Sequence, residues 1–261
     1  MTKENQVSIN RVAGLTIFFW IIKILSTTVG ETAADFMAID MHIGLIRTTL
    51  LIAMITIVAL FWNFKIKKYF APAYWILIVT MSIEGTLITD ILVDNLEISL
   101  ITLDVLFSML ILIGFYIWYE IEGTLSIHKI TNNRREIFYW LIVLTTFSLG
   151  TAIGDSISEL LEFGYLNSFI LFGSIFFITT GLFYAKVLNG VIAFWIAFIV
   201  TRPIGASLGD FFIQSPKDGG MGISAGIINI MFFTIIISIV AYLTVSKIDI
   251  YDVSENKKGV M

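Results

Sequence analysis

The segment WLIVLTTFSLGTAIGD, which runs from Trp140 to Asp155, contains the pattern from which the architecture of this chain of 261 residues can be predicted. It is largely apolar, has a glycine 10 residues after the tryptophan, and ends on an aspartate 15 residues after it. The same three residues recur at the same spacing in WIIKILSTTVGETAAD (20–35), WILIVTMSIEGTLITD (75–90) and WIAFIVTRPIGASLGD (195–210). No other position is identical in all four windows, so the spacing marks four internal repeats.

The composition indicates a membrane protein. The chain is 57% hydrophobic and 14% charged, with a mean hydropathy of +0.92, which is unlike a soluble domain. A helix needs about 20 apolar residues to cross a hydrocarbon core of about 30 Å. Eight such stretches are present, at roughly 12–35, 43–63, 73–93, 98–118, 137–157, 166–185, 190–212 and 222–245. The sequence predicts an all-α membrane protein of eight transmembrane helices.

The tryptophan spacing predicts how the spans are grouped. Successive repeat tryptophans are 55, 65 and 55 residues apart, so each repeat contains two spans. The repeats pair into two pseudo-symmetric halves of one integral membrane domain, 1–124 (spans one to four) and 125–261 (spans five to eight). Because each repeat crosses the membrane twice, all four enter from the same side and are parallel repeats.

The basic residues predict the orientation. Loops on one side carry 12 of the 16 lysines and arginines: Lys3, Arg11, Lys65, Lys67, Lys68, Lys129, Arg134, Arg135, Lys186, Lys247, Lys257 and Lys258. Loops on the other side carry one, Lys217, together with the acidic residues Asp40, Asp94, Glu97, Glu159, Glu162 and Asp218. Positively charged loops stay in the cytoplasm, so we expect both termini to be cytoplasmic and the outer face to be acidic.

Four tandem two-span repeats, each marked by a tryptophan, resemble the bacterial membrane proteins built from the domain-of-unknown-function repeat numbered 347. The resemblance covers about 12–245 and rests on the spacing of the repeated Trp, Gly and Asp residues. It implies a multi-pass protein of the bacterial inner membrane, for which metal-ion transport is a plausible role.

The repeated tryptophans and glycines have structural interpretations. The tryptophans are expected to be anchors at the cytoplasmic membrane interface, an assignment that we prefer to a ligand role; they are Trp20, Trp75, Trp140 and Trp195. Each repeated glycine is followed four residues later by a small residue, a pattern that lets membrane helices pack closely. The glycines Gly30, Gly85, Gly150 and Gly205 therefore predict that the first spans of the repeats converge on one axis.

The repeated aspartates Asp35, Asp90, Asp155 and Asp210 have two possible roles. They lie about 22 Å along a helix from the tryptophans, in the outer part of the membrane. They could be solvated helix ends. They could instead share one site, because apolar residues continue beyond them and because Glu31 and Glu84 lie nearby. A shared site would offer oxygen ligands to a metal ion and carriers for protons.

Three basic residues also lie within the predicted spans. Arg202 precedes a proline that should interrupt or kink its helix, and is either a gate beside the acidic residues or a structural ion-pair partner. Lys23 is expected to extend to the cytoplasmic interface. Arg47 is expected to pair with Asp104, on the basis of depth alone.

These features favour secondary transport, with export as one direction, of a hard divalent cation such as manganese. The alternative is proton-coupled transport of a small anion or organic acid by Arg202 and Arg47. No catalytic or nucleotide-binding motif is present and there is no cysteine, so we expect neither an enzyme nor a cofactor. The expected partners are membrane lipids, the inorganic cation and protons, not nucleic acid. The oligomeric state is left open, with a homodimer among the options.

Overall fold

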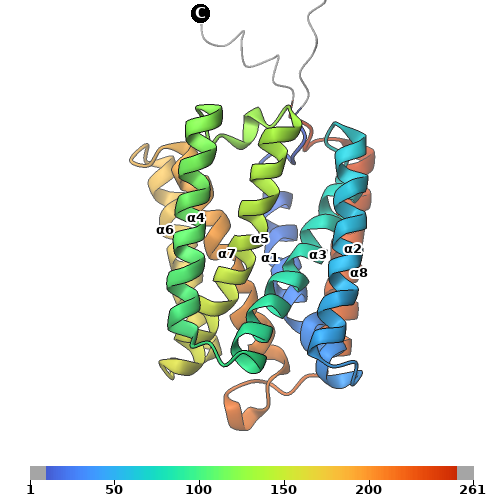
Figure 1. Ribbon diagram of the computed structural model, residues 1–261, viewed down its shortest axis with the longest axis vertical. Helices are drawn as coiled ribbons and strands as arrows, with labels where there is room; N and C mark the ends of the chain where they lie inside the picture. The colour runs from blue at the N-terminus through green and yellow to red at the C-terminus, as the bar shows by residue number, and fades with distance from the viewer. Residues whose placement is uncertain (1–9, 252–261) are drawn as a thin grey trace, which may run out of the picture.

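The computed structural model describes residues 10–251, which form helices joined by short loops and no strand (Figure 1). Lys3, Lys257 and Lys258, which contributed to the predicted orientation, lie outside these residues. Within the described part, eight helices are long and apolar enough to cross a membrane. They are α1 (Ile17–Asp35), α2 (Leu45–Ile66), α3 (Ala71–Asp90), α4 (Leu100–Glu122), α5 (Asn133–Asp155), α6 (Tyr165–Tyr184), α7 (Gly190–Ile213) and α8 (Ala225–Ser246).

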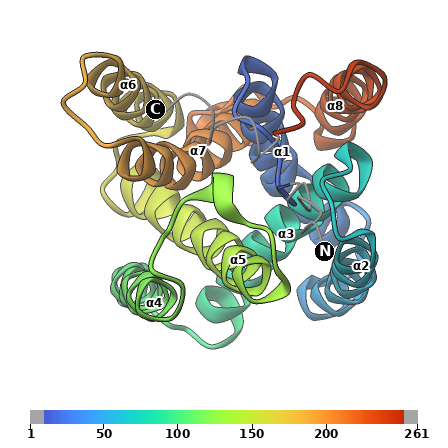
Figure 2. The same ribbon diagram turned by 90° about the horizontal axis from the view of Figure 1, so that it is seen from above.

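The first helices of the four repeats form a central ring, seen end-on in Figure 2. α1 and α5 each pack against both α3 and α7. The second helix of each repeat lies outside, against the first helix of the following repeat: α2 on α3, α4 on α5 and α6 on α7. α8, the outer helix of the last repeat, packs in the same way on α1 of the first repeat, so the four repeats form a closed circle although the last and first are not covalently linked. In each inner helix, 67% of the residues in the apolar 18-residue segment are buried within the protein, against 17–28% in the outer helices. The outer helices therefore provide most of the surface that would contact lipid.

The repeated glycines lie where neighbouring inner helices touch. Gly85 faces Phe147 of α5, and a Cβ at Gly85 would lie 2.5 Å from the Cβ of Phe147. The other three glycines make equivalent contacts around the ring: Gly30 with Ser82, Gly150 with Arg202, and Gly205 with Thr27. In every case the partner lies seven residues after the tryptophan of the next repeat. The four inner helices are therefore related by a pseudo-fourfold axis.

The repeated tryptophans are core residues, so the prediction that they anchor the protein at the membrane interface is wrong for at least three of them. Trp75, Trp140 and Trp195 are only 1%, 2% and 4% exposed, and Trp20 is half-buried. Each ring packs on the aromatic residue that precedes the tryptophan of the previous repeat: Trp75 on Phe19, Trp140 on Tyr74, Trp195 on Tyr139 and Trp20 on Phe194. These contacts lie between neighbouring inner helices, so the tryptophans join repeat to repeat.

Three inner helices change their winding directly after the repeated aspartate. α1, α3 and α5 continue as single π-helical turns, Phe36–Asp40, Ile91–Asn95 and Ser156–Leu160. α7 continues as an α-helix to Ile213, so of the two outcomes predicted for Pro203, an interruption or a kink, the interruption does not occur. The packing of Pro203 and Arg202 against Gly150 supports the helix at this point. Single π-turns within helices are frequent at functional sites.

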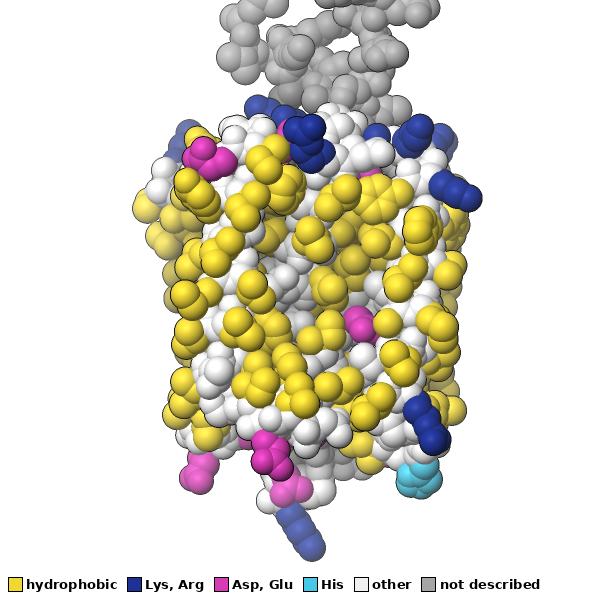
Figure 3. All heavy atoms as spheres, in the orientation of Figure 1, with side chains coloured by type: hydrophobic (Ala, Val, Ile, Leu, Met, Phe, Trp, Pro, Cys, Tyr) yellow, Lys and Arg dark blue, Asp and Glu magenta, His cyan; other side chains and the backbone are white. Residues whose placement is uncertain are grey.

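The two ends of the bundle differ in charge. We call the end at which residues 10–14 and 247–250 lie the terminal face, because Gly14 there donates a backbone hydrogen bond of 2.7 Å to Asp249. On the side shown in Figure 3, Lys and Arg gather at this face, and most Asp and Glu lie at the other end, which we call the acidic face. A broad hydrophobic band separates the two. The structure therefore has the charge asymmetry of a membrane-spanning bundle.

The first span starts later than predicted, at Ile17 instead of residue 12. Residues 10–14 instead cross the terminal face as a buried segment, with Val12 and Ala13 each 1% exposed. Arg11 forms an ion pair of 2.7 Å with Glu136 and a backbone hydrogen bond to Ile130. The apolar residues of this segment are buried by protein, not by lipid, and they cover the terminal end of the ring.

Candidate functional site

Arg202 lies at the centre of the inner ring and is fully buried. It lies on α7, seven residues after Trp195. Residues at this position in each repeat contact the repeated glycine of the preceding inner helix, which for Arg202 is Gly150 of α5. Its guanidinium reaches all three other inner helices. Nη1 donates to the carbonyl of Thr27 on α1 (2.7 Å), and Nε donates to the carbonyl of Phe147 on α5 (3.3 Å). A single side chain therefore closes the space between the four helices.

The second terminal nitrogen of Arg202 contacts three oxygens. Nη2 donates to Glu31 Oε2 (2.8 Å), to Thr151 Oγ1 (2.7 Å) and to Thr86 Oγ1. These three residues occupy the same position in their repeats, 11 residues after the tryptophan, and so form one layer. Glu31 and Arg202 are buried together, with side chains 8% and 0% exposed. A buried pair of this kind requires further hydrogen bonds to offset its desolvation, and the threonines supply them.

The four repeated aspartates lie one helical turn from this layer, toward the acidic face. Each interacts electrostatically with Glu31, and neighbours around the ring also repel one another: Asp35 with Asp90, Asp90 with Asp155, and Asp210 with both Asp155 and Asp35. Three of the aspartates are half-buried and Asp210 is 4% exposed. Within residues 10–251, these carboxylates form no side-chain hydrogen bond or ion pair. They therefore form one acidic ring at this end of the inner helices, and we call these four carboxylates the vestibule.

The vestibule is not a closed metal cage in this structure. Across residues 10–251, no group of three or more His, Asp or Glu side chains is arranged so that it could hold a metal ion. The metal-ligand role predicted for Asp35, Asp90, Asp155 and Asp210 would therefore need these helix ends to move closer together. The π-turns that follow three of the aspartates are natural places for such a movement, because their hydrogen-bond pattern already differs from that of an α-helix.

Lys23 lies on the terminal side of Arg202, contrary to the prediction that it reaches the membrane interface. It is fully buried, and its Nζ lies 4.1 Å from the ring centroids of both Phe147 and Phe198. No hydrogen-bond partner of Nζ is present among the described residues. Lys23 is four residues before Thr27 and therefore on the same helix face. We call Lys23, Arg202, Glu31 and the four aspartates the charged column. The four-residue spacing of Lys23, Thr27, Glu31 and Asp35 along α1 could have predicted that Lys23 belongs to it.

The axis is closed beyond Lys23. One further turn toward the terminal face, the hydroxyls of Tyr74 and Tyr139 are 2.5 Å apart, and both side chains are 1% exposed. The buried segment 10–14 lies beyond these tyrosines, at the terminal face. The structure is therefore open to solvent at some of the aspartates and sealed from Arg202 to the terminal face.

Three predicted site residues lie away from this column. Glu84 is two positions from Thr86 and so on the other side of α3; its buried Oε2 has no partner among the described residues. Arg47 is exposed in the first turn of α2. Its predicted pairing with Asp104 is wrong, because α2 and α4 pack on different inner helices and Asp104 accepts a hydrogen bond of 2.6 Å from Ser156.

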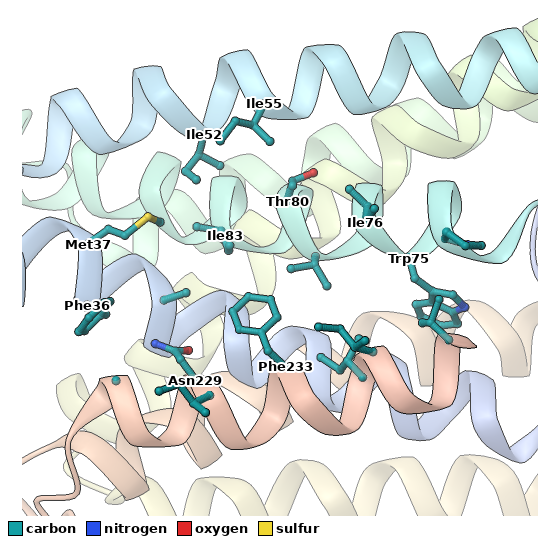
Figure 4. A pocket seen from close by; sticks show the side chains of 18 of the residues that line it. Phe36, Met37, Ile52, Ile55, Trp75, Ile76, Thr80, Ile83, Asn229 and Phe233 are labelled. Atoms are coloured by element: carbon teal, nitrogen blue, oxygen red, sulfur yellow. The ribbon is translucent and has the colours of Figure 1, made fainter. Parts of the chain in front are cut away.

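A lateral groove of about 890 Å³ lies between α2 and α8, with α3 at its base (Figure 4). Its lining is almost entirely apolar, as the side chains of Ile55, Ile83 and Phe233 illustrate. The one amide, Asn229, is engaged with Thr32 through hydrogen bonds of 2.7 and 3.1 Å. The groove is suited to apolar groups, not to a hydrated ion.

The ring of four parallel helix pairs and its buried charged column define a multi-pass membrane protein with internal repeats. The chain belongs to the family described as Repeat of Unknown Function (DUF347), whose model matches residues 18–69, 73–124, 138–187 and 193–249. These four matches correspond to the helix pairs α1–α2, α3–α4, α5–α6 and α7–α8. No curated protein and no solved structure matches the chain.

Proposed function

We propose that the protein is a secondary transporter of a hard cation, with manganese as the first divalent candidate. The observation that carries the proposal is the ring of four equivalent aspartates above the buried Arg202–Glu31 pair. Carboxylate oxygens are the ligands that hard cations prefer. Repulsion between neighbouring carboxylates would be relieved by a cation, so the vestibule would concentrate cations from the acidic side.

The charge asymmetry supports an orientation in a cell membrane, which we take to be a bacterial inner membrane. The terminal face, with Lys65, Lys67, Arg134 and Arg135, would be cytoplasmic under the positive-inside rule. The described conformation would then be open to the outside and closed to the cytoplasm. Transport requires a second conformation in which Arg202 leaves the axis, the vestibule closes and the segment 10–14 moves aside.

Protons are the coupling ions that the vestibule favours. A cation and protons would compete for the same carboxylate oxygens, and closely spaced carboxylates titrate as a group. Release of the cation on one side would allow protonation on the other. Such competition would produce exchange without nucleotide hydrolysis, and with export it would lower the cytoplasmic content of the metal.

The proposal is tested by Mn²⁺ flux in liposomes that contain the purified protein. Asp90→Asn keeps the shape of the side chain and removes one charge of the ring, so flux should fall at least tenfold, a loss that corresponds to about 1.4 kcal/mol. The matched control is Asp94→Asn, an exposed carboxylate one turn beyond on the same helix extension, which should retain most of the flux. Full flux in all four single Asn variants of the ring would refute the cation pathway.

The alternative is transport of a small anion. The observation that favours it is the presence of two buried basic residues in one column, Arg202 and Lys23, with a single carboxylate, Glu31, which pairs with Arg202 and not with Lys23. Arg47 has no part in this version, since it is exposed on α2. Isothermal titration distinguishes the two: Arg202→Lys should weaken anion binding through loss of the planar fork, whereas cation binding at the aspartates should persist.

A further inference from the structure

The acceptors around Arg202 resemble the ligand shell of an ion. Five oxygens from three helices surround the guanidinium: two backbone carbonyls (Thr27 and Phe147), two hydroxyls (Thr86 and Thr151) and one carboxylate (Glu31). We call these five oxygens the axial oxygen cage. Nη2 carries two hydrogens but has three of the oxygens as neighbours. One more acceptor is present than the guanidinium nitrogen can satisfy in linear hydrogen bonds.

The hydroxyls of the cage are oriented as acceptors. Thr151 Oγ1 donates its own proton to the Phe147 carbonyl at 3.2 Å. Thr86 Oγ1 is within reach of the Gly30 and Ser82 carbonyls at 3.3 and 3.4 Å, both nearer than Glu31 Oε2 at 3.5 Å. With their protons engaged by backbone carbonyls, both hydroxyls present lone pairs to whatever lies between them. Such a shell of carbonyl, hydroxyl and carboxylate oxygens is what hard cations take.

The fourth helix lacks the corresponding oxygen. The residue of α7 equivalent to Glu31, Thr86 and Thr151 is Ala206, which is fully buried. Three helices thus contribute an oxygen to this layer, and α7 contributes the positive charge one turn away. The cage is asymmetric in the way expected if Arg202 occupies a place that is otherwise filled by an ion.

We propose that the axial oxygen cage is a binding site for a monovalent cation such as Na⁺ or K⁺, in which the Arg202 guanidinium is an internal substitute. The cage holds one formal negative charge, on Glu31, so a cation of charge +1 replaces Arg202 without changing the net charge of the cage. A divalent cation would leave an excess positive charge there, which is costly in hydrocarbon. The proposal deepens the proposed function: the monovalent ion would enter as Arg202 leaves the axis during transport.

The test uses binding and requires no transport. Arg202→Met empties the cage while keeping an unbranched side chain of similar length. The purified variant is placed in a buffer whose only cation is N-methylglucamine, which is too large for the cage, and is titrated with Na⁺, K⁺ or Rb⁺. Thermal unfolding should shift upward and keep rising with the logarithm of the ion concentration above its Kd, because an ion at 100 times its Kd raises the folded-to-unfolded ratio about 100-fold. The wild-type protein, with Arg202 in the cage, should shift far less over the same range.

Two double variants assign the ion to the cage. Arg202→Met with Thr151→Val removes one ligand and should weaken the ion effect at least tenfold in concentration. Arg202→Met with Thr145→Val is the control, because Thr145 lies on the same helix and bonds only to its own backbone at Leu141. Equal ion responses of the two double variants would overturn the proposal.

The remaining outcomes also decide the question. No upward shift with any monovalent ion, a shift with Mn²⁺ or Mg²⁺ alone, or a variant that stays unfolded at every ion concentration would each overturn the monovalent site. A monovalent shift that depends on Thr151, together with absent Mn²⁺ flux in the wild type, would keep the site and remove manganese transport. The two proposals therefore fail separately.

Discussion

Removing the carboxylate of Glu31 should expose how strongly the central charges depend on each other. Glu31→Gln preserves shape and leaves Arg202 with two carbonyl and two hydroxyl acceptors but no counter-charge. Breaking a buried ion pair by removing one partner costs about 3–5 kcal/mol. A change of 1 kcal/mol moves the unfolding temperature of a chain of this size by about 2–4 °C. The expected decrease is therefore roughly 6–20 °C, on the same estimates.

The double variant makes the prediction specific. Glu31→Gln together with Arg202→Met removes both charges, so its loss of stability should be smaller than the sum of the two single losses by at least about 1 kcal/mol. The assay is thermal unfolding of the purified variants in one detergent at constant ionic strength. Glu120→Gln, an exposed carboxylate on the outer helix α4, is the control and should shift little. Additive losses for Glu31 and Arg202 would refute the account of them as one buried unit.

Three further predictions concern packing, orientation and pH. Gly85→Ala places a Cβ against Phe147 and should cost about 1–3 kcal/mol, whereas Gly173→Ala, with nothing within 4 Å, should be neutral; equal thermal stabilities would contradict the close helix contact. In intact cells an impermeant thiol reagent should label Asp94→Cys and not Lys67→Cys, and the reverse pattern would invert the proposed orientation. Burial lowers the pKa of His128, so the unfolded chain binds more protons and stability should fall as pH drops through about 6.5; His128→Asn should flatten the unfolding temperature between pH 7.5 and 5.5, and an unchanged slope would exclude His128 as its source.

The eight apolar stretches predicted the number of helices, and the spacing of three repeated residues predicted their grouping. Trp, Gly and Asp at fixed intervals predicted four helix pairs, and the glycines do lie at the contacts between inner helices. The start of the first span was misplaced because hydropathy records that Val12 and Ala13 are apolar, not whether lipid or protein buries them. The tryptophans were misassigned for the same reason. An aromatic residue at the correct depth fits an interface anchor until neighbouring helices are known to cover it.

The central site was only partly predictable, because depth along a helix was considered and direction around it was not. Glu84 and Thr86 are at nearly the same depth, yet α3 directs them to opposite sides. Lys23 was assigned to the interface from its depth, although it shares a helix face with Thr27. The pairing of Arg47 with Asp104 failed because nothing in the spacing shows that each outer helix packs on the following repeat. Tertiary contacts between repeats, not local patterns, decide these positions.

Because α8 of the last repeat packs on α1 of the first, the same fold could be built from a chain that begins at a different repeat. Each repeat crosses the membrane twice and re-enters from the same side, and Gly14 and Asp249 are joined by a backbone hydrogen bond. A circular permutant, with the native ends linked and a new start within the connection 123–132, would therefore keep every helix in its place and in its original direction. The covalent order of the four helix pairs is one of four equivalent ways to cut the same closed loop.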